Sequence, residues 1–174
     1  MFKNVSFRIV ALSLALGTSA VGTAAEQGDE PQLSCPVGTK QFGSRATMTD
    51  RGVFCVKQKA DDSLPVAHGP YVSYHPNGQK KAVGQHVNGA QAGVWTFFDA
   101  NGVKTEEIEF AGGNYHGRRL QFFVTGQKKL EERWVGGKRE GTAMAFAENG
   151  QKVSEFEYQG GHLVKENGRP AVAK

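Results

Sequence analysis

Three series of glycines recur every 24 residues between positions 69 and 161 of the chain. They are Gly69, Gly93, Gly117 and Gly141; Gly78, Gly102, Gly126 and Gly150; and Gly89, Gly113, Gly137 and Gly161. A fixed period of this length indicates a repeat architecture, in which each unit packs only against its neighbours. In a chain of 174 residues, four such units at 69–164 leave room for little else.

Each unit contains two turn signals between runs of alternating polar and apolar residues. The first is Asn-Gly or Thr-Gly and the second is Asn-Gly or Gly-Gly, as in Asn77-Gly78 and Asn88-Gly89. Asn and Gly tolerate the positive φ angles of a type I′ turn, so the pattern predicts β-hairpins. We therefore expect an all-β fold in which four stacked antiparallel hairpins form an elongated one-layer sheet or open solenoid.

The alternation also predicts one apolar and one charged face, because residues two apart on a strand share a face. The expected apolar column combines the bulky residues of both strands of each unit. Its members are Val72, Tyr74, Thr96, Phe98, Leu120, Phe122, Met144 and Phe146 from the first strands, with Ile108, Phe110, Trp134, Phe156 and Tyr158 from the second.

The segments outside the repeats predict export. Residues 1–25 combine Lys3 and Arg8, an apolar run and a closing Thr23-Ala24-Ala25, as in a cleaved signal peptide. An uncleaved anchor is the alternative, although the run is shorter than the roughly 20 apolar residues that span a bilayer. Residues 26–68 are expected to cap the array, and residues 165–174 to form a flexible tail. The predicted location is the periplasm, the outer cell surface or the medium.

The two cysteines, Cys35 and Cys55, agree with export. An oxidising compartment favours a disulfide between them, and two free thiols are the alternative. Without the leader, 19 basic residues face 17 acidic ones, and the acids are interspersed among the bases. A nucleic-acid partner is therefore not expected, because such proteins gather Lys and Arg on one surface.

The phrases YHPNGQKKAVGQHVNGAQAGVW and FAENGQKVSEFEYQGG resemble the MORN repeat variant of bacterial proteins named the YwqK antitoxin family. The resemblance covers residues 69–164, and the Cys-bracketed segment before them is similar to the leader of exported members. Gly93 and Trp95 match the Gly-x-Trp opening of a repeat, while Arg119 and Ala143 depart from it. The resemblance implies a binding or scaffolding module for phospholipid head groups or protein partners.

One lysine follows the first turn of every unit, giving Lys80, Lys104, Lys128 and Lys152. In stacked units these form a ladder that could attract a phospholipid surface or an acidic polymer. The alternative is that they keep strand edges soluble. Tyr71 and Trp95 are further candidate binding residues on an exposed strip, with packing as the alternative role for Trp95.

Nothing in the sequence indicates catalysis, a metal or a cofactor. The histidines are scattered and lack metal or triad spacing; they are His68, His75, His86, His116 and His162. We therefore expect a non-enzymatic exported binding or scaffolding protein at the cell envelope. The first alternative is an antitoxin or immunity protein that neutralises a partner toxin, and the second is a hydrolase of envelope material that uses His and Glu.

Overall fold

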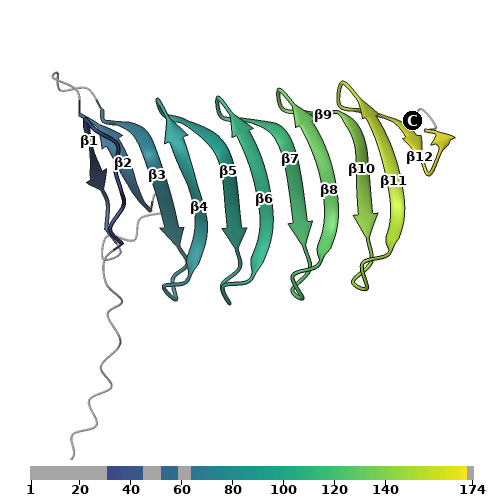
Figure 1. Cartoon of the computed structure of the whole chain (residues 1–174), viewed down its shortest axis with the longest axis horizontal. Helices are drawn as coiled ribbons and strands as arrows, with labels where there is room; N and C mark the ends of the chain where they lie inside the picture. The colour runs from purple at the N-terminus through teal and green to yellow at the C-terminus, as the bar shows by residue number, and fades with distance from the viewer. Residues whose placement is uncertain (1–30, 45–51, 59–63, 172–174) are drawn as a thin grey trace, which may run out of the picture.

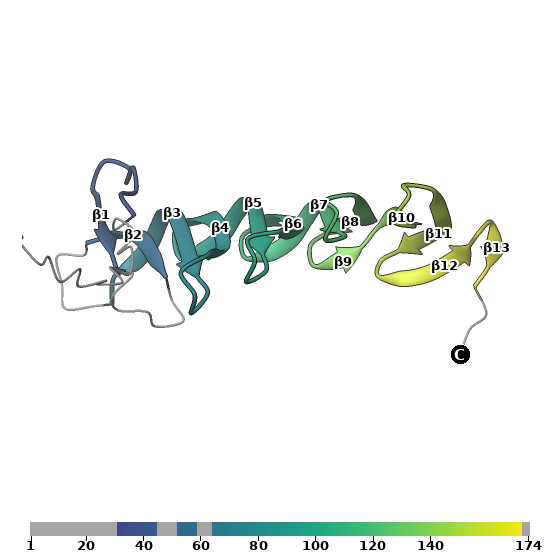
Figure 2. The ribbon, with the colours of Figure 1, turned by 90° about the horizontal axis from the view of Figure 1, so that it is seen from below.

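The computed structural model describes residues 31–44, 52–58 and 64–171. These residues form one thirteen-stranded antiparallel sheet and contain no helix (Figure 1). Seen from below, the strands follow one another along the long axis in a single layer (Figure 2). The expected all-β repeat array is thus confirmed. The predicted signal peptide at 1–25 lies outside the described residues.

The strands succeed one another in chain order across the sheet, apart from one interruption. They are β1 (Thr39–Phe42), β2 (Val53–Lys57), β3 (Val66–Tyr74), β4 (Lys80–Val87), β5 (Ala90–Phe98), β6 (Lys104–Ala111), β7 (Asn114–Phe122), β8 (Lys128–Val135), β9 (Lys138–Arg139), β10 (Gly141–Phe146), β11 (Lys152–Gln159), β12 (His162–Glu166) and β13 (Arg169–Pro170). Both β9 and β10 pair with β8. Glu140 lies between them and donates its N–H to the Arg133 carbonyl at 2.9 Å.

The second turn of each unit has the predicted form. At Asn88-Gly89 the φ angles are 51° and 89°, and at Gly112-Gly113 they are 57° and 81°. Two successive positive φ angles are those of a type I′ turn, which matches the twist of the flanking strands. Asn88 and Asn167 are the non-glycine residues with positive φ in the described part of the chain.

The first turn of each unit is not of the predicted type I′. At His75–Gln79 only Gly78 has a positive φ, and its N–H donates to the His75 carbonyl. The Asn77 side chain accepts from the Gln79 N–H at 3.1 Å. Pairing then shifts between Ser73 and Tyr74, as expected for a longer hairpin loop with an adjoining bulge. The same shift recurs in the other three units.

The predicted assignment of faces is wrong for the first strand of each unit. Trp95 lies directly opposite Ile108, whereas Thr96 lies opposite Glu107. Opposite residues of an antiparallel pair share a face, so Trp95 belongs with Ile108 and Thr96 does not. Alternation defines two sets of residues on each strand, but only the register between strands decides which sets combine. We call the side with Trp95 and Ile108 the aromatic face.

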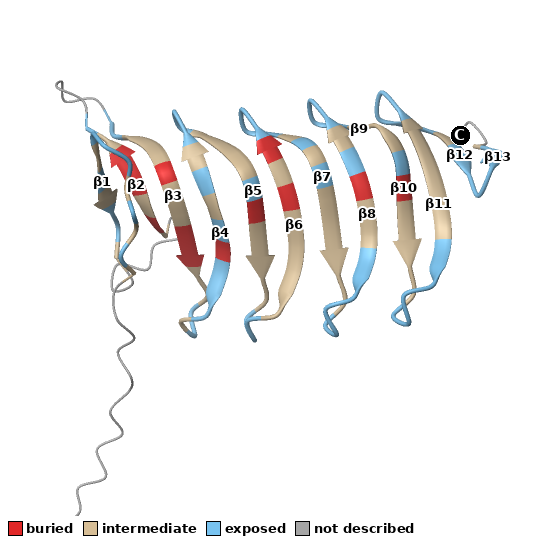
Figure 3. Cartoon of the chain, in the orientation of Figure 1, coloured by how far each residue is buried: buried red, intermediate tan, exposed pale blue. Residues whose placement is uncertain are grey.

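A continuous row of ring contacts crosses the aromatic face from β1 to β8. Neighbouring ring centroids lie 5.0–6.1 Å apart. The members of this ring row are Phe42, Phe54, Tyr71, Trp95, Phe110, Tyr115 and Trp134. Each such contact stabilises the fold by roughly 0.5–1.5 kcal/mol beyond the contribution of the buried area itself. The buried residues accordingly fall in bands across successive strands rather than in one compact centre (Figure 3).

The N-terminal end of the array is joined to the predicted cap by a disulfide. Cys35 and Cys55 are bonded, with Cα atoms 5.5 Å apart, which confirms the predicted pairing. Cys55 lies on β2, is fully buried and belongs to a strand that pairs with β3. The described parts of residues 26–68 therefore extend the sheet of the repeats instead of forming a separate layer.

Replacing both Cys35 and Cys55 with serine is expected to destabilise the N-terminal end by about 3 kcal/mol, from the lost constraint on the unfolded chain. Because repeats couple chiefly to their neighbours, amide exchange should accelerate in β2 and β3 and stay unchanged in β8 to β11. Hydrogen-exchange mass spectrometry measures both. A reductant should reproduce the effect in the wild type and leave the variant unaltered; equal exchange in all four samples would contradict the prediction.

The C-terminal end differs from the expected flexible tail at 165–174. Lys165 and Glu166 lie in β12, and Arg169 and Pro170 pair with them as β13. The intervening Asn167-Gly168 has φ angles of 49° and 76°, so it forms the same type I′ turn as the repeats. The turn signal thus continues the sheet beyond the last full unit.

Candidate functional site

The four ladder lysines lie on the side of the sheet opposite the aromatic face, which we call the lysine face. Each begins the second strand of its unit, at the start of β4, β6, β8 and β11. Register places Lys80 opposite Tyr74 and Lys104 opposite Phe98. The predicted ladder therefore exists as a row of equivalent positions along the sheet.

Three of the four lysines form ion pairs with a glutamate three residues later. The Nζ–Oε distances are 3.1 Å for Lys104–Glu107, 2.8 Å for Lys128–Glu131 and 2.6 Å for Lys152–Glu155. The hydrogen bond from Lys128 lowers the pKa of Glu131, and the charge of Arg118 acts in the same direction. Glu131 is therefore ionised at neutral pH and compensates the charge of Lys128.

Two of the same lysines also pack on an aromatic ring of the following unit. Lys104 Nζ lies 4.1 Å from the ring centroid of Phe122, and Lys128 Nζ lies 5.2 Å from that of Phe146. A cation over a ring is attracted by roughly 0.5–1 kcal/mol at an exposed site. These lysines thus join consecutive units as well as carrying charge.

Lys80 departs from this pattern. Position 83 holds valine where the later units hold Glu107, Glu131 and Glu155. Lys80 is exposed, and within the described residues it forms neither an ion pair nor a cation–π contact. The missing glutamate is visible in the aligned repeats, although the lysine recurs in all four units.

Trp95, a candidate binding residue, is a packing residue in the structure. Only 3% of its surface is exposed, and its indole N–H donates to the Gln85 carbonyl at 3.1 Å. A Cβ added to Gly84 would lie 2.3 Å from the indole ring, so the ring occupies the space that glycine leaves free. The expected exposed strip at Trp95 is therefore wrong, while the alternative packing role is confirmed.

Tyr71, the second aromatic candidate, is half-buried beside Trp95. Its ring centroid lies 5.0 Å from that of Trp95 and 5.3 Å from that of His86. Burial lowers the pKa of His86, and its Nδ1 atom has no hydrogen-bond partner. The imidazole is therefore neutral at pH 7 and packs as a ring between Tyr71 and Trp95.

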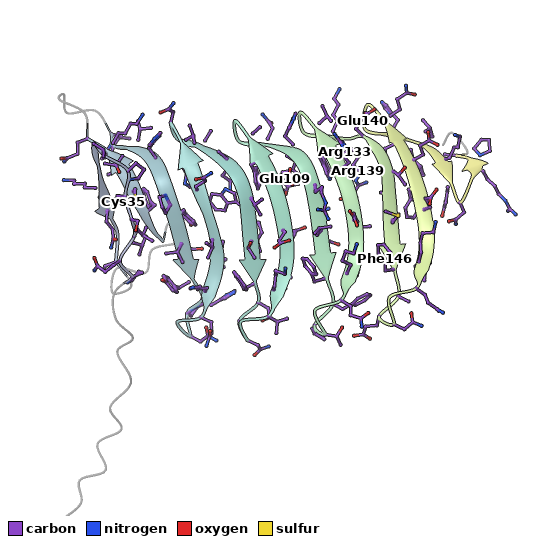
Figure 4. All side chains as sticks on the ribbon, viewed as in Figure 1. Cys35, Glu109, Arg133, Arg139, Glu140 and Phe146 are labelled. Atoms are coloured by element: carbon purple, nitrogen blue, oxygen red, sulfur yellow. A yellow bond between two sulfur atoms is a disulfide. The ribbon has the colours of Figure 1, made fainter. Side chains whose placement is uncertain are left out.

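A buried charge network on the aromatic face was missed by the sequence analysis. Glu132, 3% exposed, lies 2.7 Å from Arg119 Nη1 and 2.8 Å from Arg139 Nε. It also accepts a hydrogen bond from Trp134 Nε1 at 3.2 Å. Arg119 reaches Glu106 as well, with Nε donating at 2.7 Å. Arg139, labelled in Figure 4 near Arg133, lies over the rings of Trp134 and Tyr158.

This network replaces the apolar packing of the first two units. Arg119 occupies the place of Tyr71 and Trp95 in the period, and Glu132 that of Ile108. Burial opposes the charge of Arg119, but hydrogen bonds and Coulomb attraction from Glu132 and Glu106 outweigh it and raise its pKa. The signal in the sequence was two charged residues, Arg119 and Glu132, at positions that the other units fill with uncharged ones.

No group of three or more metal-ligating side chains occurs in the described parts of the chain. Over the same residues, no helix is long and apolar enough to cross a membrane. The groups whose pKa values shift belong to the ion pairs and ring contacts above.

Two segments of the chain, residues 67–88 and 91–111, match the MORN repeat variant. They contain β3 with β4 and β5 with β6, the hairpins of the first two units. These two units are similar to MORN repeats. In the structure, the third and fourth units continue the sheet with the same register shifts.

Among solved structures, one similar chain belongs to the "Glycosylation Associate Protein (Gap123) complex from Streptococcus agalactiae". It is 17% identical, with a TM-score of 0.37, and the match covers 66% of this chain and 20% of that one. This chain thus spans only a small part of that protein. No curated protein matches the sequence.

Proposed function

We propose that this MORN-repeat protein is a non-catalytic binding module for a protein partner at the cell envelope. MORN repeats are generally binding or scaffolding modules, and here the units form an open, unclosed sheet. Long one-layer arrays offer extended surfaces to macromolecules rather than enclosed pockets. The predicted leader and the Cys35–Cys55 disulfide support an oxidising envelope compartment.

The ion pairs between ladder lysines and glutamates are the observation that favours a protein partner over an acidic surface. Attraction to an anionic membrane requires several uncompensated basic residues, each contributing about 1 kcal/mol. Three of the four ladder lysines lie within 3.1 Å of a carboxylate oxygen. The lysine face is therefore a mixed surface of alternating charges, which suits a protein partner of complementary pattern.

The purified protein is expected to remain unbound in flotation assays with vesicles of phosphatidylglycerol and phosphatidylcholine. The matched control changes Lys104, Lys128 and Lys152 to glutamine and should behave identically, because these charges are already paired. Vesicle binding by the wild type that falls with salt and disappears in the triple variant would overturn the choice of a protein partner.

A photo-crosslinking residue at Val94, which is 54% exposed on the lysine face, tests for the partner directly. Irradiation in the producing cells should yield one discrete cross-linked polypeptide of the envelope fraction. The same probe at Trp95, which is buried, is the control and should yield none. The absence of any cross-linked polypeptide from several exposed positions would overturn the proposal, and a toxin as the captured polypeptide would favour the immunity alternative.

A further inference from the structure

A cleft opens on the lysine face where the first turns of units one and two meet. Its volume is about 370 Å³, and it is lined by Tyr74, Gly78, Gln79, Lys80, Phe98 and Gly102. These residues come from the facing ends of the β3–β4 and β5–β6 hairpins, at the lower edge of the sheet in Figure 1. The cleft thus combines two aromatic side chains with one ammonium group.

Hydrogen bonds join the two turns that form the cleft. His75 Nε2 lies 2.8 Å from the Phe98 carbonyl oxygen, and Asn77 Nδ2 donates to the Ala100 carbonyl at 2.5 Å. Gln79 approaches Gly102 closely enough that an added Cβ would lie 3.3 Å from its Oε1 atom. Hydrogen bonds between consecutive units therefore fix the cleft in shape, as binding sites commonly are before the ligand arrives.

The repeat itself shows what is special about this cleft. In the second and third units the equivalent lysines, Lys104 and Lys128, are held by Glu107 and Glu131 and lie over Phe122 and Phe146. Val83 removes this internal anion from the first unit. An external carboxylate can therefore take the place that a glutamate side chain fills elsewhere in the array.

We propose that this cleft receives an acidic side chain of the partner polypeptide, together with the apolar residue beside it. The inference rests on the proposed function, in which the partner is a protein. Lys80 would pair with the carboxylate, and the Tyr74 and Phe98 side chains would contact the apolar neighbour. A single lysine that has no ion-pair partner among the described residues, set in a small cleft, suits one carboxylate better than a membrane surface, which requires several basic residues.

The probes are two capped dipeptides, acetyl-Phe-Glu-amide and acetyl-Phe-Gln-amide, added to the isotope-labelled protein. The Phe-Glu probe is expected to shift the amide resonances of residues 74–80 and 98–102, with a Kd on the order of 1 mM. The neutral Phe-Gln probe should bind at least tenfold more weakly. Equal affinity for both probes, or no shifts in these residues, would overturn the proposal.

Two matched variants test whether Lys80 supplies the positive charge that binds the Phe-Glu probe. Val83→Glu supplies the glutamate of the later units and should abolish binding of Phe-Glu while Lys80 remains in place. Lys104→Gln removes one positive charge that is already paired, and should bind Phe-Glu like the wild type. Val83 is partly exposed, and glutamate stands at this position in three units, so the variant is expected to fold. Unchanged binding by Val83→Glu would refute the role of Lys80.

Further experiments distinguish a failure of the cleft proposal from a failure of the proposed function. Phosphatidylglycerol vesicles that bind the protein and displace the Phe-Glu probe would replace the peptide with a lipid head group and overturn the proposal. Capture of the same polypeptide at Val94 in the wild type and in Lys80→Gln, with no dipeptide binding, would leave the proposed function intact and remove only the cleft. Dipeptide binding without a captured polypeptide would keep the cleft as a binding site and overturn the proposed function.

Discussion

Replacing Glu132 with alanine is expected to lower the free energy of unfolding by about 3–5 kcal/mol, the usual cost of breaking a buried ion pair by removing one partner. Glu132 is 3% exposed and is shared by Arg119, Arg139 and the Trp134 indole. Its loss leaves two guanidinium groups without their common carboxylate on the aromatic face. Urea unfolding followed by tryptophan fluorescence measures the change, because Trp134 lies within the network.

The adjacent residue supplies the control. Glu131→Ala removes a carboxylate from the opposite face, where it pairs with Lys128 and Arg118. Such partly exposed pairs contribute at most about 1 kcal/mol. The double variant Arg119→Leu/Glu132→Leu should recover most of the stability, since apolar residues of similar volume can replace a buried pair. A double variant as unstable as Glu132→Ala would show that the network does more than satisfy its own charges.

Replacing Trp95 with alanine is expected to cost about 3–5 kcal/mol, as for other large buried aromatic residues. Trp95 contacts the rings of Tyr71, His86, Phe97 and Phe110, and together with Ala82 and Ile108 it forms the main buried cluster. Its removal would break the ring row between the first and second units. Hydrogen exchange should therefore accelerate chiefly in β3 to β6.

Val94→Ala is the matched control, because Val94 precedes Trp95 on the same strand but is exposed on the lysine face. A surface change of this kind usually alters stability by no more than about 0.5 kcal/mol. Similar losses for both variants would contradict the assignment of Trp95 to the packed face. A uniform change in exchange from β1 to β13 would contradict the local coupling expected of repeats.

The hairpins were predictable because their signals are local. Glycine series and Asn-Gly pairs fix where the chain reverses, and positive φ at Gly89 and Gly113 follows from the residues themselves. Asn167-Gly168 carries the same turn signal, within the segment 165–174 that is predicted to be a flexible tail. The first turn was mistaken in type, since Asn77 uses its side chain to bond the Gln79 N–H instead of adopting positive φ.

Side-chain size alone could not predict which residues of each strand lie on the packed face of the sheet. Leu120 and Met144 are larger than Ala82 or Ala143, yet they are only partly buried while the two alanines are buried on the aromatic face. Pairing with the neighbouring strand and the clearance above Gly84 decide which set packs. Part of the candidate site was unpredictable for the same reason. The network at Glu132 joins residues from β6, β7, β8 and β9 that are separated along the chain.

The sequence by itself determined the 24-residue period, the repeated hairpins and the cysteine pair, because each depends on residue type at a fixed spacing. It also contained the exchange of glutamate for Val83. Only the tertiary structure decided that Trp95 is packed and that Arg119 and Glu132 meet. It also decided that three ladder lysines are paired, while Lys80 has no ion-pair partner in the part of the chain that the structure describes. These outcomes depend on distances between strands, which are set when register and side-chain packing are established together.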